Sequence, residues 1–288
     1  MLPFRRILFP VDHSEVCKLI VPSVIRLANH FDSEVTLFHA CPWPIAFYGE
    51  TMPSGYIVPE VMESAEKERL SQFADQYFAG QKIRQVVVVD DVALGISNEV
   101  ERQGTDLIMM PTRGHGVVRR LLLGSVTAKI LHDLSCPVWT GVHDALPGKD
   151  APGAYRSIIC ALSLGEESPE IARAAAAVAK SFGARLTLLH VVESSLPVPD
   201  IDYGPYLTQL MDNAQARLED LKRETGLGVD VSLAVMEGPI TSCLREEIER
   251  QSADLVIVGR GHDQEPVGRL WSHLYDIVRE SSCPVLSI

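Results

Sequence analysis

The sequence lacks the features that mark several common classes of protein. None of its apolar runs approaches the ~18 residues that a membrane-spanning helix needs, so we expect no membrane span and no membrane partner. Residues 1–10 have neither a long apolar stretch nor a small-residue cleavage site, so we expect no signal peptide. The six cysteines include no C-x-x-C pair, which argues against a disulfide framework and predicts free thiols in a reducing cytoplasm.

Several catalytic and binding signatures are also missing. The chain contains no G-x4-G-K-(S/T) phosphate loop, no G-x-S-x-G nucleophile turn and no H-E-x-x-H helix. Although His13, His39 and His115 could lie near one another, their spacing supports no metal site, so we expect none. The 26 basic and 38 acidic residues give a net charge of −12, which argues against a nucleic-acid partner because such proteins need a basic face.

What the sequence does contain is an internal repeat. The matched segments are 4–12 with 155–163, 36–39 with 187–190, 101–107 with 249–255, 113–115 with 260–262, and 135–138 with 282–285. Their offset drifts from 151 to 147 residues, and they keep the same order, which indicates a duplicated domain. We therefore expect one domain at residues 1–142, a linker rich in Pro, Gly and charge at 143–153, and a second domain at 154–288.

Each copy alternates short apolar strands with helices. In the first copy the patterns predict strands at 7–11, 34–39, 86–89, 107–110 and 137–140, and helices at 16–30, 60–79, 96–102 and 125–134. The second copy repeats this order, and its first helix, 169–182, starts with a proline and stops at Gly183. Such alternation predicts right-handed crossovers and a parallel sheet buried on both faces. The expected fold is α/β, with two doubly wound, Rossmann-like parallel-sheet domains in tandem.

A ligand of such a domain binds beyond the carboxyl ends of the strands. There, Gly124 precedes Ser125, which we expect to be the N-cap of a helix at 126–134, and a helix N-terminus suits a phosphate group. Asp12, after the first strand, could accept hydrogen bonds from a base amine or a ribose, or could cap the helix that follows it. Three cations lie in the same loop as Gly124: Arg113, Arg119 and Arg120.

These motifs resemble the universal stress protein family in its tandem form. The resemblance rests on I-L-F-P-V-D-H-S-E at 7–15, L-F-H at 37–39, G-x9-G-S ending at Ser125, and C-P-V at 136–138. It implies the adenine-nucleotide alpha hydrolase-like fold and an adenine nucleotide, ATP or else AMP or ADP, with Mg²⁺ as an optional companion. The nucleotide-binding residues that it implies, together with those that follow the strands, are Pro10, Val11, Asp12, Ala40, Met110, Arg113, Gly114, Gly124, Ser125, Val126 and Thr127.

Both copies depart from the family's pattern. In the first, Pro111 replaces a glycine and removes one N–H donor, which costs about 0.5–1.5 kcal/mol and should weaken binding without abolishing it. In the second, Ser163 stands at the position of the aspartate, and Trp271 stands at that of the glycine before the helix. Asp263 and Glu265 add negative charge there. We therefore expect one nucleotide site per chain, in the first domain.

Three functions remain open at this point. The first is a nucleotide-binding, stress-response regulatory protein of the cytoplasm, as the resemblance implies. The alternatives are a nucleotide-free module that binds an unknown protein partner, and a very slow ATP hydrolase; we expect no enzyme activity beyond a weak ATPase. Pro-rich segments at 41–59 and 193–205 could be lids or partner-binding loops. The last strands of the two domains could pair within the chain as a pseudo-dimer, with a homodimer of chains as a further option.

Overall fold

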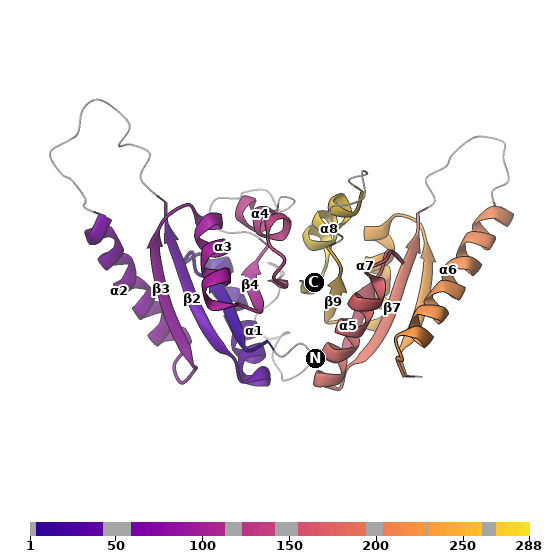
Figure 1. Ribbon diagram of the computed structural model, residues 1–288, viewed down its shortest axis with the longest axis horizontal. Helices are drawn as coiled ribbons and strands as arrows, with labels where there is room; N and C mark the ends of the chain where they lie inside the picture. Colours follow the sequence, from indigo (N-terminus) through magenta and orange to yellow (C-terminus); the bar gives the residue numbers. More distant parts are fainter. Residues whose placement is uncertain are drawn as a thin grey trace, which may run out of the picture. The chain divides into compact units, whose positions relative to one another are not determined.

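The structure is a computed structural model that describes residues 4–42, 59–112, 123–141, 155–193, 204–228, 230–260 and 269–288 (Figure 1). The chain divides near residue 140 into two compact units, which we call the N-terminal and the C-terminal domain. Strands and helices alternate in both, and the predicted fold class of two doubly wound parallel-sheet domains is confirmed. The predicted linker, 143–153, lies outside the described residues.

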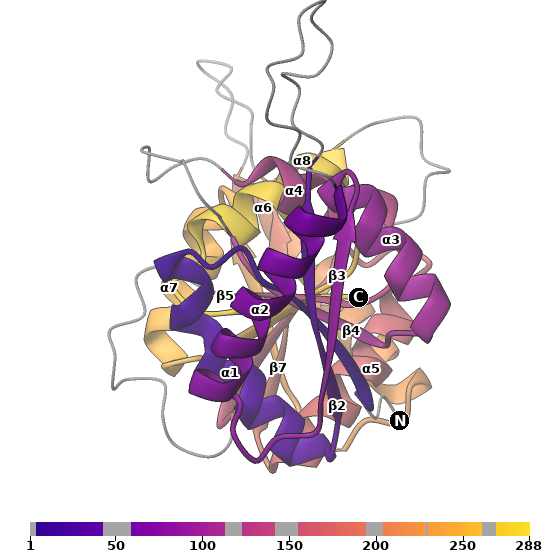
Figure 2. The ribbon, with the colours of Figure 1, turned by 90° about the vertical axis from the view of Figure 1, so that its left-hand side faces the viewer.

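The N-terminal domain has a five-stranded sheet in the order β3-β2-β1-β4-β5. Its elements are β1 (Arg6–Pro10), α1 (Glu15–Phe31), β2 (Glu34–Cys41), α2 (Pro59–Tyr77), β3 (Ile83–Val89), α3 (Val92–Gln103), β4 (Leu107–Pro111), α4 (Ser125–Asp133) and β5 (Val138–Gly141). β1 pairs in parallel with both β2 and β4, so the chain reverses its direction of winding between these two neighbours of β1. Accordingly α1 and α2 lie on one side of the sheet and α3 on the other (Figure 2). Such a switch point opens a crevice at the carboxyl ends of β1 and β4.

The C-terminal domain repeats this topology in the order β8-β7-β6-β9-β10. Its elements are β6 (Ser157–Ala161), α5 (Ser168–Phe182), β7 (Arg185–Val192), α6 (Gly204–Glu224), β8 (Ser232–Glu237), α7 (Ile240–Gln251), β9 (Leu255–Val258), α8 (Arg269–Glu280) and β10 (Val285–Ser287). The central strand β6 pairs in parallel with β7 and with β9, as β1 does with β2 and β4. The internal repeat of the sequence is therefore also a repeat of topology.

The first helix of each domain shows why these residues fold locally as they do. In α1 the Ser14 side chain accepts a hydrogen bond from the Cys17 N–H and caps the helix, whose buried residues recur at three- and four-residue spacing. Asp32 ends α1 in the left-handed conformation. In α5 a proline stands in the first turn and Gly183, at φ 65°, closes the helix, as the sequence predicts.

The central strands form the core, since both faces of the sheet are covered by helices. Ile7, Leu8 and Phe9 of β1 are at most 1% exposed, and Ile158 and Ile159 of β6 are fully buried. This near-continuous apolar run is typical of a parallel sheet covered on both faces. Among the helices that the structure describes, none is both long and apolar enough to cross a bilayer.

Candidate functional site

A cavity of about 540 Å³ lies at the crevice of the N-terminal domain. It is bounded by the carboxyl ends of β1, β2 and β4 and by the start of α4. Nine of the eleven residues that the sequence singles out line it: Pro10, Val11, Asp12, Ala40, Met110, Gly124, Ser125, Val126 and Thr127. The other two, Arg113 and Gly114, lie outside the described residues, as do Arg119 and Arg120.

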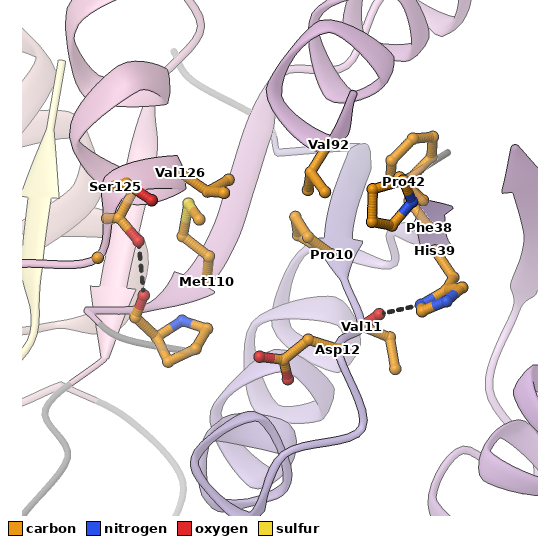
Figure 3. Close-up of a pocket in the computed structure, with 14 residues that line it drawn as sticks. Pro10, Val11, Asp12, Phe38, His39, Pro42, Val92, Met110, Ser125 and Val126 are labelled. Carbon is orange, nitrogen blue, oxygen red and sulfur yellow. Dashed lines mark hydrogen bonds between the residues drawn. The ribbon is translucent and has the colours of Figure 1, made fainter. Parts of the chain in front are cut away.

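The walls of the cavity come from the carboxyl ends of two neighbouring strands, β1 and β4, and from the starts of α3 and α4, two helices that are in contact with each other. Figure 3 shows Ser125, Val126 and Met110 on one side and Pro10 and Val92 on the other. Most of this surface is apolar, which suits a flat organic ring. Apolar side chains exclude water from a bound ligand. A hydrogen bond from a polar group of the cavity to that ligand is therefore stronger than the same bond in water.

Asp12 provides the carboxylate of the cavity wall, and its side chain points away from His39 (Figure 3). One of its oxygens, Oδ1, accepts the Ser14 N–H at 2.9 Å, so the carboxylate braces the turn that leads into α1. The alternative that Asp12 itself caps this helix is wrong, because Ser14 occupies the capping position.

The start of α4 forms the opposite end of the cavity. Here the prediction that Ser125 is the N-cap is wrong: Gly124 is the N-cap, and α4 begins at Ser125. A glycine has no side chain to accept from the first turn, so no side-chain cap bond forms, and the first backbone N–H groups lack a partner within the helix. The helix start is tied to the end of β4 by the Gly124 N–H, which donates to the Thr112 carbonyl at 2.9 Å, and by Thr127 Oγ1, which donates to the Pro111 carbonyl at 3.2 Å.

Five residues outside the set of eleven also line the cavity: Phe38, His39, Pro42, Val92 and Pro111. Pro111 was expected at the site as the residue that replaces a glycine of the family's pattern. Val92 was missed because α3 starts four residues before the predicted helix at 96–102, with Asp91 as its N-cap. The signal was present, since an aspartate before a run of helix formers is a typical N-cap. The others lie in the last residues of β2 and β4 or directly after β2, where the rule that places ligands at the carboxyl ends of strands leads.

Two histidines at matching strand ends make the same contact. His39 Nδ1 lies 2.7 Å from the Val11 carbonyl oxygen, and His190 Nδ1 lies 2.8 Å from that of Leu162. These two histidines of the repeat, His39 and His190, thus have the same structural role. Beside His39, burial and then the nearby Arg69 charge lower the pKa of His13 to about 4, so its imidazole is neutral at pH 7.

The corresponding place in the C-terminal domain holds a much smaller pocket of about 100 Å³. Ser163 replaces the aspartate; its hydroxyl accepts the Gly165 N–H at 3.1 Å and lies 3.2 Å from Glu167 Oε1. The Glu167 carboxylate lines this pocket, so an anion there would meet negative charge. A shallower depression of about 800 Å³ adjoins it on the side of α6.

The sequence predicts that residues around the start of α8, above all Trp271, prevent a nucleotide from binding in the C-terminal domain. α8 begins at Arg269, so Trp271 belongs to the helix itself, whereas its counterpart Gly124 lies just before α4. Asp263 and Glu265 lie outside the described residues, and so does Gly261. The expected filling of the pocket by the indole therefore remains a prediction.

Comparison with known proteins assigns both halves to one family. The model of the universal stress protein family matches residues 3–140 and again residues 154–288. A universal stress protein of Methanocaldococcus jannaschii is 27% identical over 139 residues, which is 47% of this chain and 80% of that protein. One of Thermus aquaticus is 29% identical over 139 residues, which is 46% of this chain and 98% of that protein.

Solved structures show that the fold of the whole chain is shared. A universal stress protein of Archaeoglobus fulgidus superimposes with a TM-score of 0.68 at 21% identity, covering 100% of this chain and 97% of that chain. A putative universal stress protein of Pseudomonas aeruginosa gives 0.67 at 16% identity, covering 99% and 93%. On the strength of the two family matches, this chain belongs to the universal stress protein family and carries two of its domains in tandem.

Proposed function

We propose that the protein is a stress-response regulator that binds one adenine nucleotide, ATP or its mono- or diphosphate, in the N-terminal cavity. The observation that carries the proposal is the shape of that cavity: an apolar slot with a carboxylate at one end and an uncapped helix start at the other. Its volume of about 540 Å³ falls within the roughly 300–1,000 Å³ that small-molecule sites occupy.

The chemistry of the two ends gives the nucleotide a direction. The phosphates belong at the start of α4, where free N–H groups and the helix dipole favour negative charge and Gly124 lets the backbone approach closely. The base then lies against Val11, Ala40 and Met110, and Asp12 accepts hydrogen bonds from its amine or from the ribose.

The C-terminal domain, in our proposal, takes no nucleotide. Its pocket of about 100 Å³ is too small for a base, and the Glu167 carboxylate on its wall repels phosphate. The protein would then sense nucleotide with one half, and the bound nucleotide would change the surface that this half presents to a protein partner.

Catalytic turnover is not required for this role. Among the described residues that line the cavity, Asp12 is the one carboxylate and no lysine is present, whereas phosphoryl-transfer sites combine cations, metal-binding acids and a group that positions water. Mg²⁺ arriving with the nucleotide would be held mainly by phosphate oxygens and water. A regulatory protein of the cytoplasm also fits the six cysteines, all of which are buried free thiols.

The stoichiometry of binding tests the proposal. Isothermal titration of the full chain with ATP should give one equivalent per chain, and mass spectrometry of small molecules released from the purified protein should detect an adenine nucleotide. Two equivalents would contradict the assignment to one domain, and no binding of ATP, ADP or AMP would favour the nucleotide-free module.

Replacing Asp12 by serine imitates the C-terminal domain and should weaken ATP binding about 10–100-fold, since a hydrogen bond to a charged group contributes about 1.5–3 kcal/mol. The turn should survive, because Ser163 already accepts the N–H two residues on, as Asp12 does. The reverse change, Ser163→Asp, is the matched control and should leave the stoichiometry at one. Unchanged affinity in Asp12→Ser would remove the aspartate from the site.

A further inference from the structure

Three side chains from distant parts of the N-terminal domain converge beside the cavity. His13 follows β1, His39 is near the end of β2, and Glu66 lies on α2. One potential ligand atom of each lies within 4.8 Å of the others, and all three residues are half-buried. Two imidazoles and a carboxylate are a common ligand set for Zn²⁺ and other first-row transition metals.

The orientation of His39 is the one that metal-binding histidines adopt. Its Nδ1 lies 2.7 Å from the Val11 carbonyl oxygen, and because a carbonyl can only accept, Nδ1 must carry the proton. Nε2 is then the ring nitrogen that remains to bind a metal ion, and it lies 3.5 Å from Glu66 Oε2. A backbone carbonyl that fixes the tautomer and the ring in this way is the usual support of a metal ligand.

Two atoms of the cluster are buried without a hydrogen bond. They are His13 Nε2 and Glu66 Oε2, and buried polar atoms of this kind are uncommon in folded proteins because each costs about 1–3 kcal/mol. The His13 ring is held in place, since its centroid is 5.1 Å from that of His39 and 5.7 Å edge-on from that of Phe73. A cation between the three side chains would give His13 Nε2 a partner, and it would replace the longer contacts that Glu66 Oε2 makes with His39 and Arg69.

The C-terminal domain keeps the backbone of this cluster and one of its histidines. His13 has a φ of 59°, and Leu164, its counterpart 151 residues on, has a φ of 61°. His190, the counterpart of His39, makes the same bond to the Leu162 carbonyl. The turn and the strand-end histidine are thus features of the fold, whereas the imidazole of His13 is particular to the N-terminal domain.

The carboxylate is particular to the N-terminal domain as well. Leu70 of α2 and Leu218 of α6 are both fully buried and mark equivalent helix positions, 148 residues apart. At that offset Glu66 corresponds to Ala214, which is buried. The C-terminal domain therefore retains one of the three potential ligands. It serves as an internal control, because we expect no metal binding at the equivalent place in that domain.

The charges around the cluster are mixed. Glu66 and the nearby Asp12 favour a cation, while Arg69 opposes it and lies 3.7 Å from Glu66 Oε2. The Arg69 side chain is 57% exposed, so it can turn into solvent when another cation takes the carboxylate. Tetrahedral Zn²⁺ with bonds of about 2.0–2.2 Å needs its ligand atoms roughly 3.3 Å apart, a closure that side-chain rotation supplies.

We propose that His13, His39 and Glu66 bind a divalent transition-metal ion of the zinc class, with a fourth position open to water or to a ligand in the adjoining cavity. His39 lines that cavity, so the metal site and the proposed nucleotide site share a wall. The metal site does not depend on the nucleotide for its ligands, and either proposal can fail without the other.

Metal titration of the full chain tests this inference. Isothermal titration with Zn²⁺ should give one equivalent per chain, and Co²⁺ should give visible ligand-field bands of a site with fewer than six ligands. His13→Leu and Glu66→Ala, which introduce the residues of the C-terminal domain, should each weaken Zn²⁺ binding at least about 100-fold, because partners that merely orient ligands already contribute about 10–100-fold. The Co²⁺ bands should disappear in both variants.

Two controls separate this site from adventitious binding. His132→Ala removes a surface histidine that lies 2.7 Å from Asp133, and it should leave the titration unchanged. Glu66→Gln keeps the shape of the side chain, so it should lose the metal while the metal-free protein unfolds as the wild type does. Unchanged Zn²⁺ affinity in Glu66→Gln and His13→Leu, or the absence of any Zn²⁺ uptake by the wild type at micromolar concentration, would overturn the assignment.

Discussion

Replacing Gly124 by tryptophan should reduce the affinity for ATP at least about 100-fold, which corresponds to ~2.7 kcal/mol. Gly124 is the N-cap of α4 and lines the cavity, so an indole there would occupy the space beside the N–H groups that we assign to phosphate. The variant places in the N-terminal domain the residue that the C-terminal domain has at position 271. Isothermal titration with ATP measures the loss.

The backbone at this position makes the experiment a test of space rather than of folding. Gly124 has φ −62° and ψ 140°, an extended conformation that any residue adopts. Gly124→Ala should therefore fold and bind with a smaller loss than the tryptophan variant, and Trp271→Gly should leave the stoichiometry at one. Wild-type affinity in Gly124→Trp would show that the phosphates do not lie at the start of α4.

Replacing Phe78 by alanine should destabilise the N-terminal domain by about 3–5 kcal/mol, the usual cost of removing a large buried aromatic side chain. Phe78 is 1% exposed, and its ring lies 6.0 Å from that of Phe9 and 6.2 Å from that of Phe73. Phe78 directly follows α2, and its ring lies between those of Phe73 in α2 and Phe9 in β1, so the cavity left behind weakens the link between helix and sheet. Urea unfolding followed by far-UV circular dichroism measures the shift.

An exposed aromatic residue supplies the comparison. Tyr206 of α6 is 54% exposed, so Tyr206→Ala should change the free energy of unfolding by less than about 0.5 kcal/mol. Since the chain has two domains, the two variants should be compared through the transition that Phe78→Ala moves. A loss below ~1 kcal/mol in Phe78→Ala would mean that the aromatic cluster is loosely packed.

The sequence was sufficient for the fold because its local patterns agree with one another. Apolar runs, helical spacing and end signals such as Gly183 all act over a few residues, and the repeat supplies each of them twice. The predicted helix at 16–30 is Glu15–Phe31 in the structure, and the predicted strand at 107–110 is Leu107–Pro111. The errors lie at the ends of elements: the start of α3 was predicted four residues late, and the N-cap of α4 was wrong by one residue because both Gly and Ser are acceptable N-caps.

The candidate site was predicted less completely, for a reason of distance. The strand-end rule and the family resemblance led to nine residues that line one cavity, because carboxyl ends of parallel strands meet at the same edge. Neither could lead to Glu66, which lies 27 residues from His39 on a helix whose rotation about its axis depends on packing against β2 and β3. A metal site can be recognised from residue spacing in the sequence when its ligands lie on one local element, such as a single helix. Here the three potential ligands come from three separate segments of the chain.

By itself, the sequence determined that the protein is a duplicated α/β domain, and it led to the prediction that one copy retains the elements of a nucleotide site while the other has lost them. These conclusions depend on short-range spacing and on residue identity. Tertiary structure decided the size of each pocket, about 540 Å³ against about 100 Å³, and the meeting of two histidines with a glutamate. The volume of a pocket and the convergence of distant side chains both depend on how helices pack on a twisted sheet. This packing is a long-range property that no local sequence pattern encodes.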